Sequence, residues 1–339
     1  MRRLAALSGG LLALAGLAAV AAWIFGQRYL QMPLPIGHAA QVVNIRSGAS
    51  LIASAEAMAD QGVLSHPQVF AWYARLRGDG RDIKAGEYRI DPGTTPRALL
   101  DQLVSGGVLL HALTVVEGWT FDQMLVAIRA HPAIQQTLRR HDRAAIMAEL
   151  GEAGRHPEGL FFPETYRFPR ATTDLTLLRQ ARTLMDQRLE AAWAARAPGL
   201  PLETPYSALI LASIVEKETA LEAERTLIAG VFARRLERNM RLQTDPSVIY
   251  GIGDGFDGDI RRRDLSRDTP YNTYTRGGLP PTPIALPGAA SLEAVMHPAP
   301  GETLYFVATG AGDGSHYFST TLAEHNEAVQ RLLARRRNL

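Results

Sequence analysis

The sequence contains no cysteine, so it can form neither disulfide bonds nor thiolate metal sites, and a cysteine nucleophile is excluded. Its nine histidines include no pair at the His-x-x-x-His spacing of helical zinc sites. No Gly-x-Ser-x-Gly elbow occurs, and no glycine-rich loop is followed by Lys-Ser or Lys-Thr, so serine-nucleophile and nucleotide-binding chemistry lack support. We therefore expect a protein without a metal ion or another cofactor.

Lysine is almost missing as well, because Lys84 and Lys217 are the only lysines in the chain. Arginine supplies nearly all the positive charge, and the formal net charge is only +2 for 339 residues. The arginines are spread through the whole chain, so we expect no nucleic-acid partner. A hydrophobic content of 46% in a chain of this length predicts two folded units with sizeable cores.

The first residues predict a membrane anchor. Arg2 and Arg3 precede the run Leu4–Gly26, which contains no charged residue and is long enough as a helix to cross roughly 30 Å of hydrocarbon. A cleavable signal peptide is the alternative, because the small residues of Ala18–Ala22 suit a cleavage site. The arginines before the run place the N-terminus in the cytoplasm, so residues 1–27 are predicted as a cytoplasmic tip and a single-pass inner-membrane anchor, with the remaining chain in the periplasm.

A proline-containing linker at residues 28–40 precedes the first predicted unit, which spans residues 41–107. Its expected elements are a strand at 41–45, helices at 50–61 and 67–77, a strand at 86–90 and a helix at 95–103. This small α/β order resembles the LysM-like modules that hold glycan strands. An unspecialised spacer is the alternative.

The second half of the chain begins with a connecting α/β segment at residues 108–155. A strand at 109–116 and helices at 121–130 and 142–150 are expected in it. Residues 156–339 are then predicted as one further domain. Its first stretch, Glu158–Tyr166, is dense in aromatic residues, and a long helix at 175–195 follows.

The strongest chemical signal is a pair of acids at the end of an apolar segment. Ala208–Val215 is apolar at almost every helical angle and predicts a buried helix, which Glu216 and Glu218 follow. Partial desolvation there raises the pKa of a carboxyl group toward the range of a general acid, whereas a first solvated turn is the alternative. The two acids lie about 200° apart on a helix, so they cannot face the same groove. Glu222 would raise the pKa of Glu218 further if the helix continued.

Beyond these acids, residues 227–236 form an amphipathic helix whose polar face carries Arg234 and Arg235. Loops rich in amides, hydroxyls and aromatic rings follow, and their prolines limit the entropy lost when they order. Such a surface suits the apolar faces and hydroxyl groups of sugar rings. Each of these loop residues has a structural alternative as a buried turn-former.

Five separated motifs agree in order and spacing with one family over nearly the whole chain. They resemble the YceG-like endolytic murein (peptidoglycan) transglycosylase family. The motifs are Ser213–Thr219, Arg241–Pro246, Tyr271–Tyr274, Gly278–Pro281, and His316–Phe318 with His325–Asn326. Two departures, Thr282 after the paired prolines and Ala285-Leu286 before Pro287, concern only loop detail around the substrate.

The resemblance implies an α+β fold with a single N-terminal transmembrane helix, a small LysM-like module and a lysozyme-like catalytic domain at residues 156–339. It implies a lyase of the bacterial inner membrane that cleaves the MurNAc–GlcNAc bond within nascent glycan strands. The reaction uses no water, leaves 1,6-anhydro-MurNAc ends and terminates strand elongation. The implied partners are peptidoglycan glycan strands and the cell-wall synthases of the elongation machinery.

The family pattern places the catalytic acid at the glutamate followed by threonine, which is Glu218 here. One carboxyl group then performs both proton transfers. Glu216 is expected in a structural ion pair with an arginine of residues 227–238. Lys217 pairs with one of the two glutamates, contacts a stem-peptide carboxylate or is solvated. The groove wall is expected to consist of Gln243, Thr244, Asp245, Tyr271, Asn272 and Tyr274.

Two other functions remain open from the sequence. Asp245 is the only candidate for a second, lysozyme-type carboxylate, so a muramidase-type hydrolase is the enzymatic alternative. A non-catalytic peptidoglycan-binding scaffold is the alternative outside enzymes. The products released from glycan strands distinguish these three functions.

Overall fold

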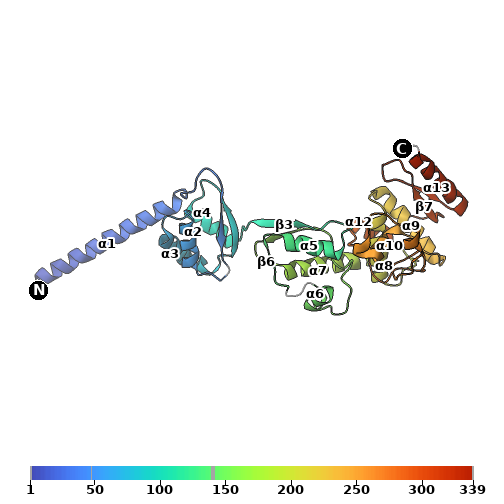
Figure 1. Cartoon of the computed structure of the whole chain (residues 1–339). Helices are drawn as coiled ribbons and strands as arrows, with labels where there is room; N and C mark the ends of the chain where they lie inside the picture. The colour runs from blue at the N-terminus through green and yellow to red at the C-terminus, as the bar shows by residue number, and fades with distance from the viewer. Residues whose placement is uncertain (1, 47, 139–141, 338–339) are drawn as a thin grey trace. The chain divides into compact units, whose positions relative to one another are not determined.

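Figure 1 shows the computed structural model, which describes residues 2–46, 48–138 and 142–337. The chain divides into two compact units, Met1–His111 with Arg167–Ala171 and Ala112–Tyr166 with Thr172–Leu339. Helices and strands occur in both, so the predicted α+β class is confirmed. The ends of the predicted domain scheme, residues 1 and 339, lie outside the described residues.

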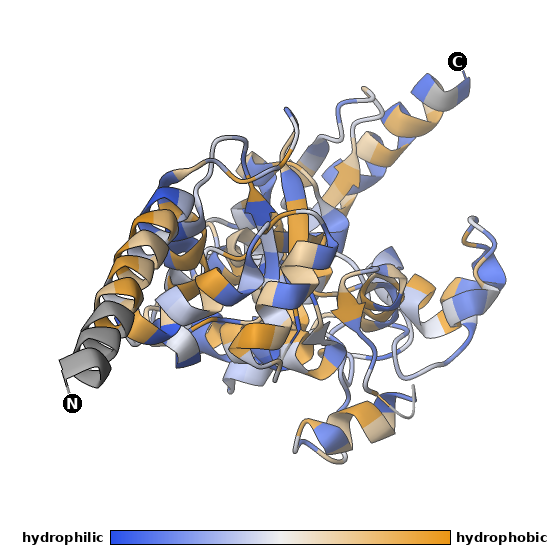
Figure 2. Ribbon diagram, turned by 90° about the vertical axis from the view of Figure 1, so that its left-hand side faces the viewer, coloured by the Kyte–Doolittle hydropathy of each residue, from blue (hydrophilic) through white to orange (hydrophobic). Residues whose placement is uncertain are grey.

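The N-terminal helix α1 (Arg2–Gln31) contains the predicted anchor. Its part Leu12–Gln31 is long and apolar enough to cross a membrane, and it is the one such helix among the described residues. Apolar residues dominate the coloured part of this helix in Figure 2. Its last turn packs on the first unit, where the His66 N–H donates to the Tyr29 hydroxyl and Leu30 is buried. The length and composition of α1 agree with a spanning helix, and its orientation stays a prediction.

The rest of the first unit follows the predicted order of elements. These are β1 (Gln41–Ile45), α2 (Leu51–Asp60), α3 (Pro67–Arg77), β2 (Gly86–Ile90) and α4 (Pro96–Ser105). The two strands pair antiparallel, with Val43 opposite Tyr88, and both side chains are fully buried. Ser50 and Thr95 accept backbone hydrogen bonds that cap the first turns of α2 and α4, as their positions predict. The likeness of this unit to LysM modules stays a prediction.

The second unit is mainly helical. Its elements are β3 (Leu110–Thr114), α5 (Phe121–Ala130), β4 (Ile134–Gln135), α6 (Arg143–Glu149), β5 (Thr165–Pro169), β6 (Thr172–Thr173), α7 (Asp174–Ala194), α8 (Pro205–Glu218), α9 (Glu222–Glu237), α10 (Asp245–Ile252), α11 (Arg262–Ser266), α12 (Ala289–Met296), β7 (Tyr305–Ala308), β8 (His316–Ser319) and α13 (Leu322–Arg337). Some residues of β3 and β5 are assigned to the first unit. The strand pairs are β3 with β5, β4 with β6 in parallel, and β7 with β8 antiparallel. The boundaries predicted at residues 107 and 155 stay predictions.

Helix α8 forms the centre of the second unit. It contacts α7, α9, α10 and α12, which gather around it in Figure 1. Every residue of Ala208–Val215 is buried, so the predicted buried helix is confirmed. Thr204 caps its first turn and Pro205 is its first residue, while the backbone becomes extended at Thr219. The chain therefore leaves the helix directly after Glu218.

The aromatic stretch after residue 157 is fixed to this core by a buried acid and a glycine. The Glu158 carboxylate is fully buried and accepts hydrogen bonds from the Phe121 N–H at 2.9 Å and the Tyr250 hydroxyl at 3.0 Å. Gly159 has a φ of +77°, and a Cβ atom there would lie 2.5 Å from Pro283 Cγ. The proline loop therefore packs directly on the glycine backbone.

We expect Gly159→Ala to lower the stability of the second unit by about 2–5 kcal/mol, because a left-handed alanine is strained and its methyl group overlaps Pro283. Gly199→Ala is the matched control, since Gly199 has a similar φ of +76° and no neighbour within 4 Å of the added Cβ. The control should lose only about 1–2 kcal/mol. Denaturant unfolding followed by near-ultraviolet circular dichroism measures both, and equal losses would contradict the packing argument.

Candidate active site

The two acids at the end of α8 have different neighbours, as helix geometry predicts. Glu216 Oε2 accepts hydrogen bonds from the Gly288 N–H at 3.0 Å and the Ser291 hydroxyl at 2.8 Å, at the N-terminus of α12. Arg225 Nη2 lies 4.0 Å from Glu216 Oε1, so the partner arginine lies just before the predicted range of 227–238. Glu216 thus holds α12 against α8, and it does not line the cavity described next.

Glu218 is the last residue of α8, and its side chain is partly buried. Burial raises the pKa of Glu218 to about 7, repulsion by Asp245 acts in the same direction, and the hydrogen bond that the Thr244 hydroxyl donates to Oε1 opposes it. Glu222 is not the like charge involved, because α8 ends at Glu218 and Glu222 begins a new helix. A pKa in this range lets Glu218 both donate and accept a proton near neutral pH.

The side chain of Glu218 lines a cavity of about 540 Å³. Three of the predicted groove residues, Gln243, Asp245 and Tyr274, line the same cavity, and β7, β8 and α13 form its other side. The Tyr274 hydroxyl donates to Asp245 Oδ1 at 2.6 Å. Thr244 reaches Glu218 from a buried position, where its N–H donates to Thr273 Oγ1 at 3.0 Å. These four predicted residues are brought together around the acid.

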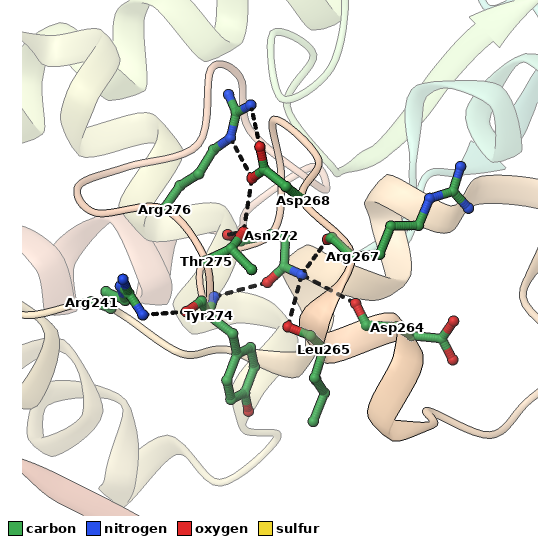
Figure 3. A network of polar contacts seen from close by, with 9 residues as sticks. All are labelled: Arg241, Asp264, Leu265, Arg267, Asp268, Asn272, Tyr274, Thr275 and Arg276. Carbon is green, nitrogen blue, oxygen red and sulfur yellow. Dashed lines mark hydrogen bonds and ion pairs between the residues drawn. The ribbon is translucent and has the colours of Figure 1, made fainter.

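Asn272 has a different place from the one predicted. It is 1% exposed, and its Nδ2 donates to the backbone carbonyls of Asp264, Leu265 and Arg267, as Figure 3 shows. Its Oδ1 accepts the Tyr274 N–H at 2.9 Å. Asn272 therefore fixes the turn that presents Tyr274, which is the structural alternative named for the loop residues.

Tyr271 also lies away from Glu218. It lines a second cavity of about 880 Å³ together with Tyr250 and Trp119. The Tyr271 hydroxyl forms a hydrogen bond with Thr282 Oγ1 at 2.8 Å. Thr282, one of the two departures from the family pattern, therefore contacts this residue. A role for Tyr271 in substrate binding stays a prediction, at a place separate from the carboxyl group of Glu218.

The Glu218 cavity is also lined by residues that are not among the predicted groove residues. His316 and His325, from the last motif, line it, and the His325 ring stacks on Tyr305 with 5.3 Å between centroids. Arg235 lines it too and is only 7% exposed, although the amphipathic pattern places it on a polar face. The last motif, which contains both histidines, was the signal that could have placed them at the site. The burial of Arg235 results from β7 and the segment after α9, which no local pattern shows.

A second buried acid competes with Glu218 as a general acid. Burial raises the pKa of Glu158 to about 7 as well, even though two hydrogen-bond donors lower it. Its side chain is 0% exposed and lines neither of the two cavities. Of Glu158 and Glu218, only Glu218 therefore lies where a substrate in the first cavity can reach it.

A family model described as the YceG-like family matches residues 43–331. The chain belongs to the YceG-like family. A protein of Bacillus subtilis (strain 168) named endolytic murein transglycosylase is 30% identical over 330 residues, covering 92% of this chain and 90% of that protein. A Streptococcus pneumoniae protein of the same name is 28% identical, covering 90% of this chain and 61% of its own length. The crystal structure of a yceG-like protein from Listeria monocytogenes gives a TM-score of 0.53 at 28% identity, covering 86% of this chain and 99% of that one.

The match to the YceG-like family confirms the resemblance seen in the sequence motifs. It begins in β1 and ends in α13. It therefore includes both compact units and all the elements that surround Glu218. The YceG-like chain from Listeria shares this fold over nearly its whole length.

Two substitutions should move the pKa of Glu218 in opposite directions. Thr244→Val removes a donor that favours the ionised carboxylate, so we expect the pKa to rise. Asp245→Asn removes a like charge, so we expect it to fall, each by about half a unit to one unit. A ¹³C NMR titration of glutamate carboxyl groups measures both shifts, and Glu218→Gln identifies the resonance.

Glu158 provides an internal control in the same titration, because neither Thr244 nor Asp245 contributes to its pKa. Its resonance should titrate near pH 7 in all variants. Shifts of Glu218 in the same direction in both variants would refute the electrostatic account.

Proposed function

We propose that the chain is an endolytic murein transglycosylase, a lyase that cleaves the MurNAc–GlcNAc bond within glycan strands and leaves 1,6-anhydro-MurNAc ends. Relatives of that name match over about nine-tenths of the chain, which supports the activity. The observation that carries the mechanism is the position of Glu218, an acid with a pKa of about 7 on a cavity wall. Membership of the YceG-like family agrees with this function.

The reaction needs one group that gives a proton and then takes one. Protonated Glu218 donates its proton to the glycosidic oxygen as the bond between that oxygen and C1 of MurNAc breaks. The resulting carboxylate accepts the proton of the C6 hydroxyl while O6 forms a bond to C1. No water is consumed, and Glu218 returns to its protonated form. A pKa near the working pH suits both steps, and the Thr244 hydrogen bond stabilises the carboxylate between them.

Asp245 supports a second candidate, the muramidase-type hydrolase. It lines the same cavity as Glu218, as a second carboxylate would in a retaining glycosidase. Oδ1 of its carboxylate accepts a hydrogen bond from the Tyr274 hydroxyl at 2.6 Å. In the transglycosylase this negative charge stabilises the positive charge that develops on the sugar ring, without forming a bond to it. A hydrolase would instead leave reducing ends.

The other parts of the proposal concern location and partners. The apolar helix α1 supports anchoring in the bacterial inner membrane, with the N-terminus in the cytoplasm and the chain after residue 27 in the periplasm. The unit at residues 41–107 would hold glycan strands as a LysM-like module, and residues 108–155 would connect it to a lysozyme-like catalytic domain at 156–339. Cell-wall synthases of the elongation machinery are the proposed partners, and strand termination is the proposed outcome.

We expect Glu218→Gln to lower the release of anhydro-ended muropeptides at least about 100-fold, because the amide can neither donate nor accept the proton. Glu216→Gln is the matched control. It lies two residues away, outside the cavity, and should retain most of the activity while it lowers stability. Mass spectrometry of digested glycan strands measures the product ends.

The same experiment in H₂¹⁸O separates the two enzymatic candidates. Anhydro ends without ¹⁸O support the transglycosylase. Reducing ends that carry ¹⁸O would support the hydrolase, and undiminished release of anhydro ends by Glu218→Gln would exclude Glu218 as the acid.

A further inference from the structure

Arg235 is a buried cation on the wall of the Glu218 cavity. Its Nε donates to the Leu304 carbonyl at 2.6 Å, and its Nη1 donates to the carbonyls of Arg241 and Leu242 at 3.0 and 2.9 Å. Nη1 also reaches Gln243 Oε1 at 3.3 Å. These bonds use Nε and Nη1 of the guanidinium group. Among the described residues, Nη2 has no hydrogen-bond partner.

The guanidinium group has no counter-charge either. Arg235 forms no ion pair with any carboxylate in the described part of the chain, although Glu218 and Asp245 line the same cavity. The guanidinium carbon lies 5.1 Å from the centroid of the Tyr305 ring. Burial lowers the pKa of Arg235 below its usual range, yet an arginine keeps its proton at any physiological pH. The cavity therefore contains a permanent positive charge that the protein itself does not neutralise.

The preceding arginine shows how the same helix holds a purely structural guanidinium. Arg234 Nε donates to the Thr303 carbonyl at 2.7 Å, its Nη1 to the Ala299 carbonyl at 2.9 Å and its Nη2 to Thr303 Oγ1 at 2.7 Å. All three nitrogens of Arg234 have partners, and Arg234 does not line the cavity. Structural anchoring by α9 therefore does not require an open nitrogen, and of these two neighbouring arginines Arg235 alone presents one to the cavity.

A buried charge without a partner is costly, and a ligand that supplies the opposite charge removes that cost. The open Nη2 group offers two N–H donors to such a ligand inside a cavity that holds the candidate acid. Burial and Arg235 together lower the pKa of His325 below its usual range, so His325 stays neutral at neutral pH and does not compete for an anion.

We propose that Arg235 binds a carboxylate group of the substrate and thereby determines which glycan strands the cavity accepts. This inference rests on the proposed function, because it takes the ligand from murein chemistry. In murein, the lactyl group of MurNAc bears either a stem peptide with free carboxylates or, after removal of the peptide, its own carboxylate. Both sources present the same chemistry to the open nitrogen of Arg235.

The full chain can be tested on four matched substrates. Glycan strands with stem peptides are compared with the same strands after conversion of their carboxylates to primary amides. Peptide-free strands with a lactyl carboxylate are compared with their amides in the same way. Amidation removes the charge and changes the size little, so it isolates the contact to Arg235. KM and kcat are measured for the wild type, and the Kd of each strand for full-length Glu218→Gln.

We expect KM and Kd to rise at least about tenfold on amidation in one of the two pairs, because a hydrogen bond between charged groups is lost. The pair that responds identifies the source of the carboxylate. The value of kcat should change much less, since the contact lies away from the proton transfers. Equal KM and Kd for free and amidated strands in both pairs would overturn the proposal.

Two variants separate binding from stability. Arg235→Met should abolish the preference for free carboxylates, whereas Arg234→Met loses a similar number of hydrogen bonds on the same helix and should keep the preference. Loss of the preference in both variants would overturn the assignment to Arg235. If Arg235→Met does not fold, the wild-type comparison alone decides.

The binding measurement also keeps this inference apart from the proposed function. A chain that releases no anhydro ends but binds free carboxylates preferentially would contradict the transglycosylase and retain the anion site. A chain that releases anhydro ends without any charge preference would retain the enzyme and exclude the site.

Discussion

The site depends on one constraint, the partial burial of a carboxyl group at the C-terminal end of a helix that is buried along most of its length. Helix α8 lies in the core of the second unit and ends at Glu218. The core therefore holds the acid in a fixed position and places it in surroundings of low polarity. The neighbouring groups then shift the pKa of this acid. Asp245 raises its pKa, Thr244 lowers it, and Tyr274 holds Asp245.

Much of this arrangement could be predicted from local sequence patterns. Apolar periodicity and turn residues located the helices from α2 to α9, most of them to within a few residues, but not α10 to α13. The angle between Glu216 and Glu218 on a helix showed that the two acids have different surroundings. The resemblance to the family supplied the choice of Glu218, which stays a prediction until it is tested. The loop segment at 243–245 was found in the same way.

The remaining features depend on contacts between distant parts of the chain. Asn272 and Tyr271 have the composition of a sugar-binding loop, yet one fixes a turn through three backbone carbonyls and the other belongs to a second cavity. Arg235 follows a helical pattern typical of a solvated face, but β7 and the segment after α9 cover it. Residue types and periodicity do not contain such information, because a side chain's neighbours are set by tertiary packing.

The two buried acids also couple the fold to protons. Glu158 and Glu218 both have a pKa of about 7 in the folded chain, above the usual 4.5 of an unfolded glutamate. Between these values the folded chain keeps protons that the unfolded chain has released, so folding takes up protons, and the stability that they contribute declines as the pH rises through this window. With two such groups the slope approaches about 2.7 kcal/mol per pH unit at most. The second unit therefore takes up protons as it folds. The contribution of these two acids to its free energy of unfolding is larger in a mildly acidic medium than at higher pH, and one of the two acids belongs to the site itself.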